Sequence, residues 1–212
     1  MEPAGLSLAL GALLLAGALS SGCGSSTRQA EERARVTGYR GIALAEPGPP
    51  VDFTLTRTTG QPFRLRGQAD GFVTLLFFGY TNCPDICPAH MANIAAVLAD
   101  LPYETRHGIR VVFVTTDPER DTPEHLRRWL DRFDPTFIGL MGSLEKVNAI
   151  QARLHLPAAV KQSTGTDEYR VGHAAQVLAL SPDGRVRVVY PFGTRQTDWA
   201  HDLPLLVATY GR

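Results

Sequence analysis

The sequence shows no excess of either charge. Lysine and arginine together number 21, aspartate and glutamate also number 21, and the formal net charge is zero. A nucleic-acid-binding surface usually appears as a basic stretch interleaved with aromatic residues, and none is visible here. The pattern therefore excludes nucleic acid as an expected partner. The hydrophobic fraction of 44% and the charged fraction of 20% are those of an ordinary globular domain.

Long apolar runs are also scarce. The clearest candidate, residues 6–19, is shorter than the stretch of about 20 residues that a membrane-spanning helix needs. It ends in the small residues 20–22 before Cys23, which is typical of a secretory signal peptide with a bacterial lipoprotein cleavage site. We therefore predict a lipoprotein-type signal peptide over residues 1–22 and lipidation of Cys23. An uncleaved membrane anchor and simple secretion are the alternatives.

A small, polar segment follows the predicted cleavage site and has the composition of a linker. We predict a flexible tether over residues 23–44 and a single domain over residues 45–212. A domain of this length can bury a substantial hydrophobic core. With a lipid anchor at Cys23, this domain would stand on the extracytoplasmic, periplasmic face of a bacterial membrane.

Cysteine is rare, with three in the whole chain. If Cys23 is lipidated, Cys83 and Cys87 remain, and they lie four positions apart. In an oxidising compartment, two cysteines this close indicate local chemistry rather than a link between distant parts of a fold. They could form a redox-active disulfide or act as two thiolate ligands, and a purely structural disulfide is the simplest alternative.

Apolar periodicity predicts an α/β domain. Residues 51–55 and 62–65 flank a turn and indicate a β-hairpin, and the apolar run 72–78 is typical of a strand buried on both faces. Further strands are expected over residues 109–114, 137–140, 175–180 and 185–190, with helices from Pro88 onward and over 122–133, 143–154 and 197–209. Residues 165–169 are expected to form a polar loop. This order predicts a thioredoxin-like fold, a central mixed sheet with flanking helices and an added N-terminal β-hairpin.

The segment CPDICP over residues 83–88 lies between the buried strand and the helix expected from Pro88. Ligand sites in α/β proteins lie at the carboxyl ends of parallel strands, and this loop occupies such a place. We expect the helix N-terminus to stabilise Cys87 as a thiolate. Two thiolates suit Cu(I), and an added imidazole gives a ligand set that also accepts Cu(II).

Three ordered motifs resemble those of the Sco/SenC family. They are CPDICP at residues 83–88, DPERDT at 117–122 and YRVGH at 169–173, the last followed by a strand and the turn PDG at 182–184. The family consists of membrane-tethered thioredoxin-fold proteins that bind copper and help to assemble the dinuclear copper site of cytochrome c oxidase. The similarity extends from about residue 45 to the C-terminus.

This resemblance implies a ligand set and a function. Cys83, Cys87 and His173 match the copper ligands of the family, so one copper ion, Cu(I) or Cu(II), is the expected cargo. Asp117 and Asp121 match an acidic loop near the site, where they would support the ligands or contact a partner. The implied partners are the copper-receiving subunit of cytochrome c oxidase, an upstream copper donor or thiol reductant, and the membrane.

A thiol–disulfide oxidoreductase that reduces the cysteines of the target subunit is the alternative function, since a thiolate pair supports that chemistry equally well. His173 argues against it, because disulfide exchange needs no imidazole. Residues 171–181 also contain no proline, whereas thioredoxin-like reductases usually place one opposite their cysteines. A peroxidase would have threonine three residues before its reactive cysteine, and Tyr80 and Pro84 occupy those positions. We therefore predict a metallochaperone and assign no catalytic residue.

Other residues near these motifs receive simpler interpretations. Gly172 stands where the family often has aspartate, which would make the site less negative or hold His173 less firmly. His90 is offset from the apolar stripe of its helix, so we expect it to face solvent or to support the ligands. Met91 lies on the stripe and should be in the core. The remaining histidines are expected at the surface: His107, His125, His155 and His201.

Overall fold

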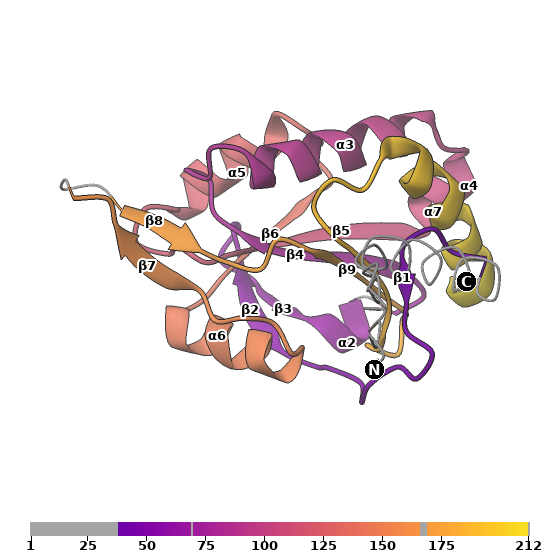
Figure 1. The fold of residues 1–212 in the computed structure, drawn as a ribbon, viewed down its shortest axis with the longest axis horizontal. Coiled ribbons are helices and arrows are strands. Elements are labelled where there is room, and N and C mark those ends of the chain that lie inside the picture. The colour runs from indigo at the N-terminus through magenta and orange to yellow at the C-terminus, as the bar shows by residue number, and fades with distance from the viewer. Residues whose placement is uncertain (1–37, 69, 166–168, 212) are drawn as a thin grey trace, which may run out of the picture.

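The computed structural model describes residues 38–68, 70–165 and 169–211 (Figure 1). The strands are β1 (Ile42–Ala43), β2 (Thr54–Arg57), β3 (Pro62–Arg64), β4 (Val73–Gly79), β5 (Ile109–Thr115), β6 (Ile138–Met141), β7 (Val160–Ser163), β8 (Tyr169–Gly172), β9 (Val177–Leu180) and β10 (Val186–Tyr190). The helices are α2 (Leu65–Gln68), α3 (Ile86–Asp100), α4 (Tyr103–His107), α5 (Pro123–Asp131), α6 (Leu144–Arg153) and α7 (Gln196–Tyr210).

Eight of these strands form one mixed sheet in the order β1-β10-β9-β4-β5-β6-β2-β3. The strands β4, β5 and β6 run parallel, whereas β9 pairs with β4 in the antiparallel direction. The predicted hairpin is present as β2 and β3, and it joins the sheet through β6. The predicted α/β fold, a thioredoxin-like mixed sheet with flanking helices, is confirmed.

Two hydrophobic clusters cover the two faces of this sheet. Leu75 and Phe77 of β4 point into a cluster with α3, α5 and α7, whereas Leu76 and Phe78 point into a second cluster with α6 and the hairpin. Figure 1 shows α3, α5 and α7 on one side of the sheet and α6 on the other. Because successive side chains of a strand alternate between faces, an unbroken apolar strand fits between two helical layers.

The hairpin of β7 and β8 differs from the sequence prediction. It forms a separate two-stranded antiparallel sheet and extends at the left of Figure 1. Tyr169, expected in a loop, is the first residue of β8. All four residues of β7 are exposed, so this strand has no apolar alternation by which its sequence could be recognised.

The folded domain begins before residue 45. The buried carboxylate of Asp202 in α7 accepts hydrogen bonds from the backbone N–H groups of Arg40 and Gly41, and β1 pairs with β10. The last residues of the predicted tether are therefore part of the fold. Cys23 and the predicted signal peptide over residues 1–22 lie outside the described residues. Within the described ranges, no helix has the length and apolar character to cross a membrane.

Candidate metal centre

The cysteine loop follows β4 and leads directly into α3. This helix begins at Ile86 rather than at the predicted Pro88, so Cys87 lies within its first turn. Cys87 is fully buried and Cys83 retains 8% exposure, and both are free thiols. The two sulfurs therefore differ in access to solvent, with Cys83 on the open side.

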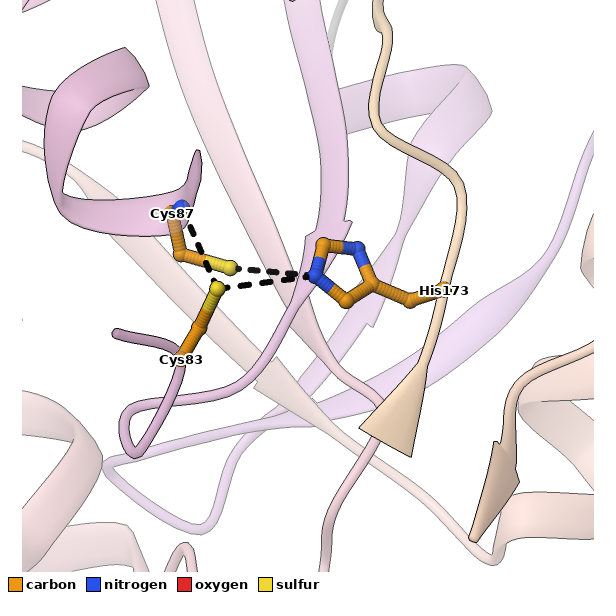
Figure 2. A group of neighbouring side chains, drawn as sticks. All are labelled: Cys83, Cys87 and His173. Carbon is orange, nitrogen blue, oxygen red and sulfur yellow. Dashed lines mark hydrogen bonds between the residues drawn. The ribbon is translucent and has the colours of Figure 1, made fainter. Parts of the chain in front are cut away.

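His173 lies at the same edge of the sheet as the cysteine loop, although it comes from a distant part of the chain. It precedes β9, and since β9 is antiparallel to β4, the start of β9 lies beside the end of β4. Its Nε2 is 3.7 Å from Sγ of Cys83 and 3.5 Å from Sγ of Cys87. Figure 2 shows the ring of His173 directed at both sulfurs. The three potential ligand atoms all lie within 4.8 Å of one another.

These separations fit a single metal ion. Metal–sulfur bonds of about 2.3 Å and metal–nitrogen bonds of about 2.0 Å, set at about 120°, would place sulfur about 3.7 Å from nitrogen. Both observed sulfur–nitrogen distances are close to that value. Two thiolates and one imidazole are soft and borderline donors of the kind that select copper or zinc over Mg²⁺ or Ca²⁺.

The backbone carbonyl of the next residue orients the imidazole of His173 toward the two sulfurs. Nδ1 of His173 lies 2.8 Å from the carbonyl oxygen of Ala174, which can only accept. Nδ1–H therefore donates to that carbonyl, and in the neutral ring this leaves the lone pair of Nε2 directed at the two sulfurs. Second partners of this kind commonly hold a metal-binding histidine in its tautomer.

The negative charge of the cysteine pair resides on Cys83. A hydrogen bond from the Cys87 thiol lowers the pKa of Cys83 to about 4, assisted by His173 when its ring is protonated and by the N–H groups of Cys87 and Asp85, while burial opposes the shift. Burial, with the neighbouring Cys83 sulfur, raises the pKa of Cys87 well above its usual value. The prediction that the helix N-terminus holds Cys87 as the thiolate is therefore wrong, because its sulfur lies in the core while that of Cys83 receives the N–H bond.

Gly79, the last residue of β4, makes room for the buried sulfur. A Cβ atom at this position would lie 2.6 Å from Sγ of Cys87 and 3.0 Å from the ring of Phe77. Any larger residue would force the sulfur of Cys87 to shift from its place in the site. The glycine that marks the end of the strand in the sequence is thus also required by the packing of the site.

His90 is buried, which contradicts the expectation that it could face solvent. Its Nε2 lies 2.9 Å from the carbonyl oxygen of Ala175, so it donates a hydrogen bond from the cysteine helix to the segment that carries His173. Burial lowers the pKa of His90, which keeps the ring neutral. His90 is thus committed to a supporting contact, while Met91 lies in the core as predicted.

Asp121 connects the cysteine loop to β5. Its buried carboxylate accepts hydrogen bonds from the backbone N–H of Thr81 at 3.1 Å, the hydroxyl of Thr81 at 2.5 Å and the hydroxyl of Thr115 at 2.6 Å. Burial raises the pKa of this carboxyl, although all three bonds act in the other direction. Asp121 therefore contacts the chain two residues before Cys83 and is sealed from solvent.

Asp117 connects the loop after β5 to the first residue of β8, the strand that ends just before His173. Its buried carboxylate forms an ion pair with Arg120 and accepts a hydrogen bond of 2.8 Å from the hydroxyl of Tyr169. Arg120 also donates to the carbonyl oxygen of Tyr169 and stacks 3.7 Å from its ring centroid. Burial, with Asp117, raises the pKa of Tyr169 to about 12, so the phenol keeps its proton. Sequence reasoning missed Arg120 and Tyr169 as parts of this contact, although both stand inside the quoted motifs.

Gly172, the residue before His173, faces another side chain of the hairpin. A Cβ atom here would meet the side-chain amide of Gln162 at 2.8 Å. This is the flexible end of a side chain on β7, which could swing aside. A larger residue at position 172 would therefore cost a rearrangement of Gln162 rather than a change in the backbone.

Comparisons with known proteins agree with this geometry. The SCO1/SenC family matches residues 48–208 of the chain. A protein of Stutzerimonas stutzeri is 39% identical over 127 residues, which cover 60% of this chain and 61% of that protein. The mitochondrial SCO2 homolog of Bos taurus is 35% identical over 136 residues, which cover 63% of this chain and 50% of that protein. The chain thus spans about half to three fifths of the length of these relatives.

Solved structures extend the comparison to three dimensions. Apo Sco1 of Thermus thermophilus has a TM-score of 0.70 and 36% identity, covering 79% of this chain and 96% of that one. ScoI of Bradyrhizobium japonicum, solved with copper bound, has a TM-score of 0.67 and 30% identity, covering 75% and 99%. With its motifs in order, its fold and its cluster of two cysteines and one histidine, the chain belongs to the SCO1/SenC family.

Proposed function

We propose that this protein is a membrane-tethered copper chaperone that binds one copper ion through Cys83, Cys87 and His173 and assists assembly of the dinuclear copper site of cytochrome c oxidase. The observation that carries the proposal is the convergence of these three donors at distances suited to one ion. Family membership and the copper-bound structure of a relative support copper as that ion.

The site is suited to carrying copper rather than keeping it. Cys83 is already a thiolate, His173 presents a lone pair, and Cys87 releases one proton when the ion binds. The partial exposure of Cys83 gives an incoming thiolate a route to the ion. Transfer would proceed by exchange of sulfur ligands, with no change in the number of electrons on either protein.

Copper transfer from the loaded, reduced protein to the soluble copper domain of an oxidase subunit tests this function. We expect the chaperone to bind one copper equivalent and then to transfer it to the acceptor. Optical spectroscopy follows both the loading and the transfer. The matched control is the same protein with Cys83 and Cys87 joined in a disulfide, which should load little copper because oxidation consumes both thiolates. Equal loading of the two redox forms would contradict the proposed site.

The alternative function, reduction of the target's cysteines, is favoured by one observation. A thiolate of low pKa that lies beside a second, protonated cysteine is the arrangement used in thiol–disulfide exchange. Cys83 would attack the target disulfide, and Cys87 would then release the target as a dithiol. This chemistry does not use His173, which is the basis for separating the two functions.

We further propose that Asp117 and Asp121 act by positioning the ligands rather than by touching the metal. Asp121 holds the start of the cysteine loop against β5, and Asp117 with Arg120 holds the first residue of β8. Lys161 of β7 also forms an ion pair with Glu119, which lies between Asp117 and Asp121 in the chain. The hairpin shares no strand pairing with the main sheet, so these contacts are well placed to set the distance between His173 and the cysteines.

Replacement of Tyr169 by phenylalanine should lower Cu(II) affinity by about tenfold, because partners of metal ligands typically contribute about 10- to 100-fold. The change removes the hydroxyl that bonds Asp117 and keeps the ring under Arg120. Chelator competition measures the affinity, and Tyr103→Phe, at an exposed tyrosine of α4, is the matched control. If both Tyr169→Phe and Arg120→Met kept the fold and the native Cu(II) affinity, the acidic loop over residues 117–122 would not position His173.

The membrane tether is proposed from the sequence, through lipidation of Cys23 after removal of residues 1–22. It would keep the domain on the extracytoplasmic face of the membrane, where the copper-receiving subunit is expected. The variant Cys23→Ala should lose incorporation of labelled fatty acid in cells. Persistent labelling of that variant would exclude Cys23 as the anchor.

A further inference from the structure

A basic hollow lies beside the cysteine loop. It has a volume of about 330 Å³ and is lined by Thr81, Asn82, His125, Arg128, Trp129 and Arg132. Thr81 and Asn82 immediately precede Cys83, whereas the other four residues come from α5 and its C-terminal cap. The hollow therefore adjoins the segment that leads directly into Cys83, the more accessible of the two cysteines.

The charged side chains lining this hollow are cationic. Arg128 and Arg132 are both exposed, and the side chain of neither forms a hydrogen bond or ion pair with any residue that the structure describes. Their neighbour Arg127 behaves differently, since it forms an ion pair with Asp131 and donates to the carbonyl oxygen of Phe137. Two guanidinium groups thus stand four residues apart at the hollow without an anionic partner among residues 38–68, 70–165 and 169–211.

We propose that this hollow receives carboxylates of an acidic segment on the protein that exchanges copper or electrons with Cys83. This inference rests on the proposed function and names the chemistry by which its partner docks. A guanidinium binds a carboxylate with two parallel hydrogen bonds, and unpaired arginines are free to do so. Charges at the rim of an interface raise the rate of association and fix its register, and here they would bring the partner's cysteines to Cys83.

The test uses thiol–disulfide exchange, which needs no copper. Two synthetic peptides carry the same disulfide between cysteines four positions apart, one flanked by glutamates and one by glutamines. The Cys83 thiolate attacks the peptide disulfide, one peptide thiolate leaves, and Cys87 completes the transfer of two electrons as the protein forms its own disulfide. We expect the acidic peptide to react about tenfold faster at low salt, because electrostatic steering changes rates by about 10- to 1,000-fold. The difference should shrink at high salt.

The double variant Arg128→Glu/Arg132→Glu should abolish or reverse this preference. Its control is Arg66→Glu/Lys146→Glu, which changes the net charge equally at exposed residues adjoining Leu65 and Val147 in the core cluster on the other face of the sheet. Equal rates for the two peptides with the native protein, or the same preference in both double variants, would overturn the proposal. If the Arg128→Glu/Arg132→Glu variant lost the preference but the native protein failed to transfer copper, the hollow would stay assigned and the chaperone function would be removed instead.

Discussion

The His173→Ala variant should lose at least about 100-fold in Cu(II) affinity, more than the loss typical for a residue that merely supports a ligand. Cu(II) favours the imidazole nitrogen, and Nε2 of His173 is the nitrogen that meets both sulfurs. Cu(I) affinity should fall far less, because two thiolates can hold that ion in near-linear geometry. The two affinities are measured by competition with chelators selective for each oxidation state.

The same variant separates the two candidate functions. Exchange with a small disulfide should continue at close to the native rate, since the thiolate of Cys83 depends first on Cys87, and His173 assists it only when its ring is protonated. His107→Ala, at an exposed histidine of α4, is the control for removal of an imidazole elsewhere. Unchanged Cu(II) affinity with collapsed exchange would make His173 an acid–base residue of an oxidoreductase.

The Cys87→Ala variant should have two large effects. It removes a sulfur donor, so copper affinity should fall for both oxidation states. It also removes the main hydrogen bond that lowers the pKa of Cys83 to about 4, so that pKa should rise toward the ordinary range for cysteine. Because the thiolate is the reactive form, alkylation of Cys83 in the variant should slow about tenfold for each pH unit below its new pKa. The native protein should keep its alkylation rate down to about pH 5.

Alkylation rates measured by mass spectrometry between pH 4 and 9 check the second effect. The matched variant is Cys83→Ala, in which the remaining Cys87 is buried and should react slowly throughout the range. If Cys87→Ala kept the native pH profile, the low pKa of Cys83 would have to come from His173 and the backbone N–H groups. That outcome would contradict the role of the Cys87 thiol as the main hydrogen-bond donor to Cys83.

Much of the fold could be predicted from the sequence because it depends on local patterns, and the ligand set was implied by the resemblance of the three motifs to the Sco/SenC family. The apolar run of β4 alternates between two core clusters, as a strand buried on both faces must. Thr122 and Ser143, the first residues of two predicted helices, accept hydrogen bonds from the first turns of α5 and α6, as residues directly before a helix commonly do. The close spacing of Cys83 and Cys87 likewise indicated a local site.

Other features depend on contacts between distant parts of the chain. His173 meets the cysteines because β9 runs antiparallel to β4, and strand direction is a property of the sheet. Cys83 rather than Cys87 holds the charge, because burial of Cys87 against Gly79 outweighs its place in the first turn of α3. The amino-acid sequence therefore determined which donor residues are present. Tertiary structure alone decided where they meet and which of them is ionised, since desolvation and through-space hydrogen bonds exist only once the layers have packed.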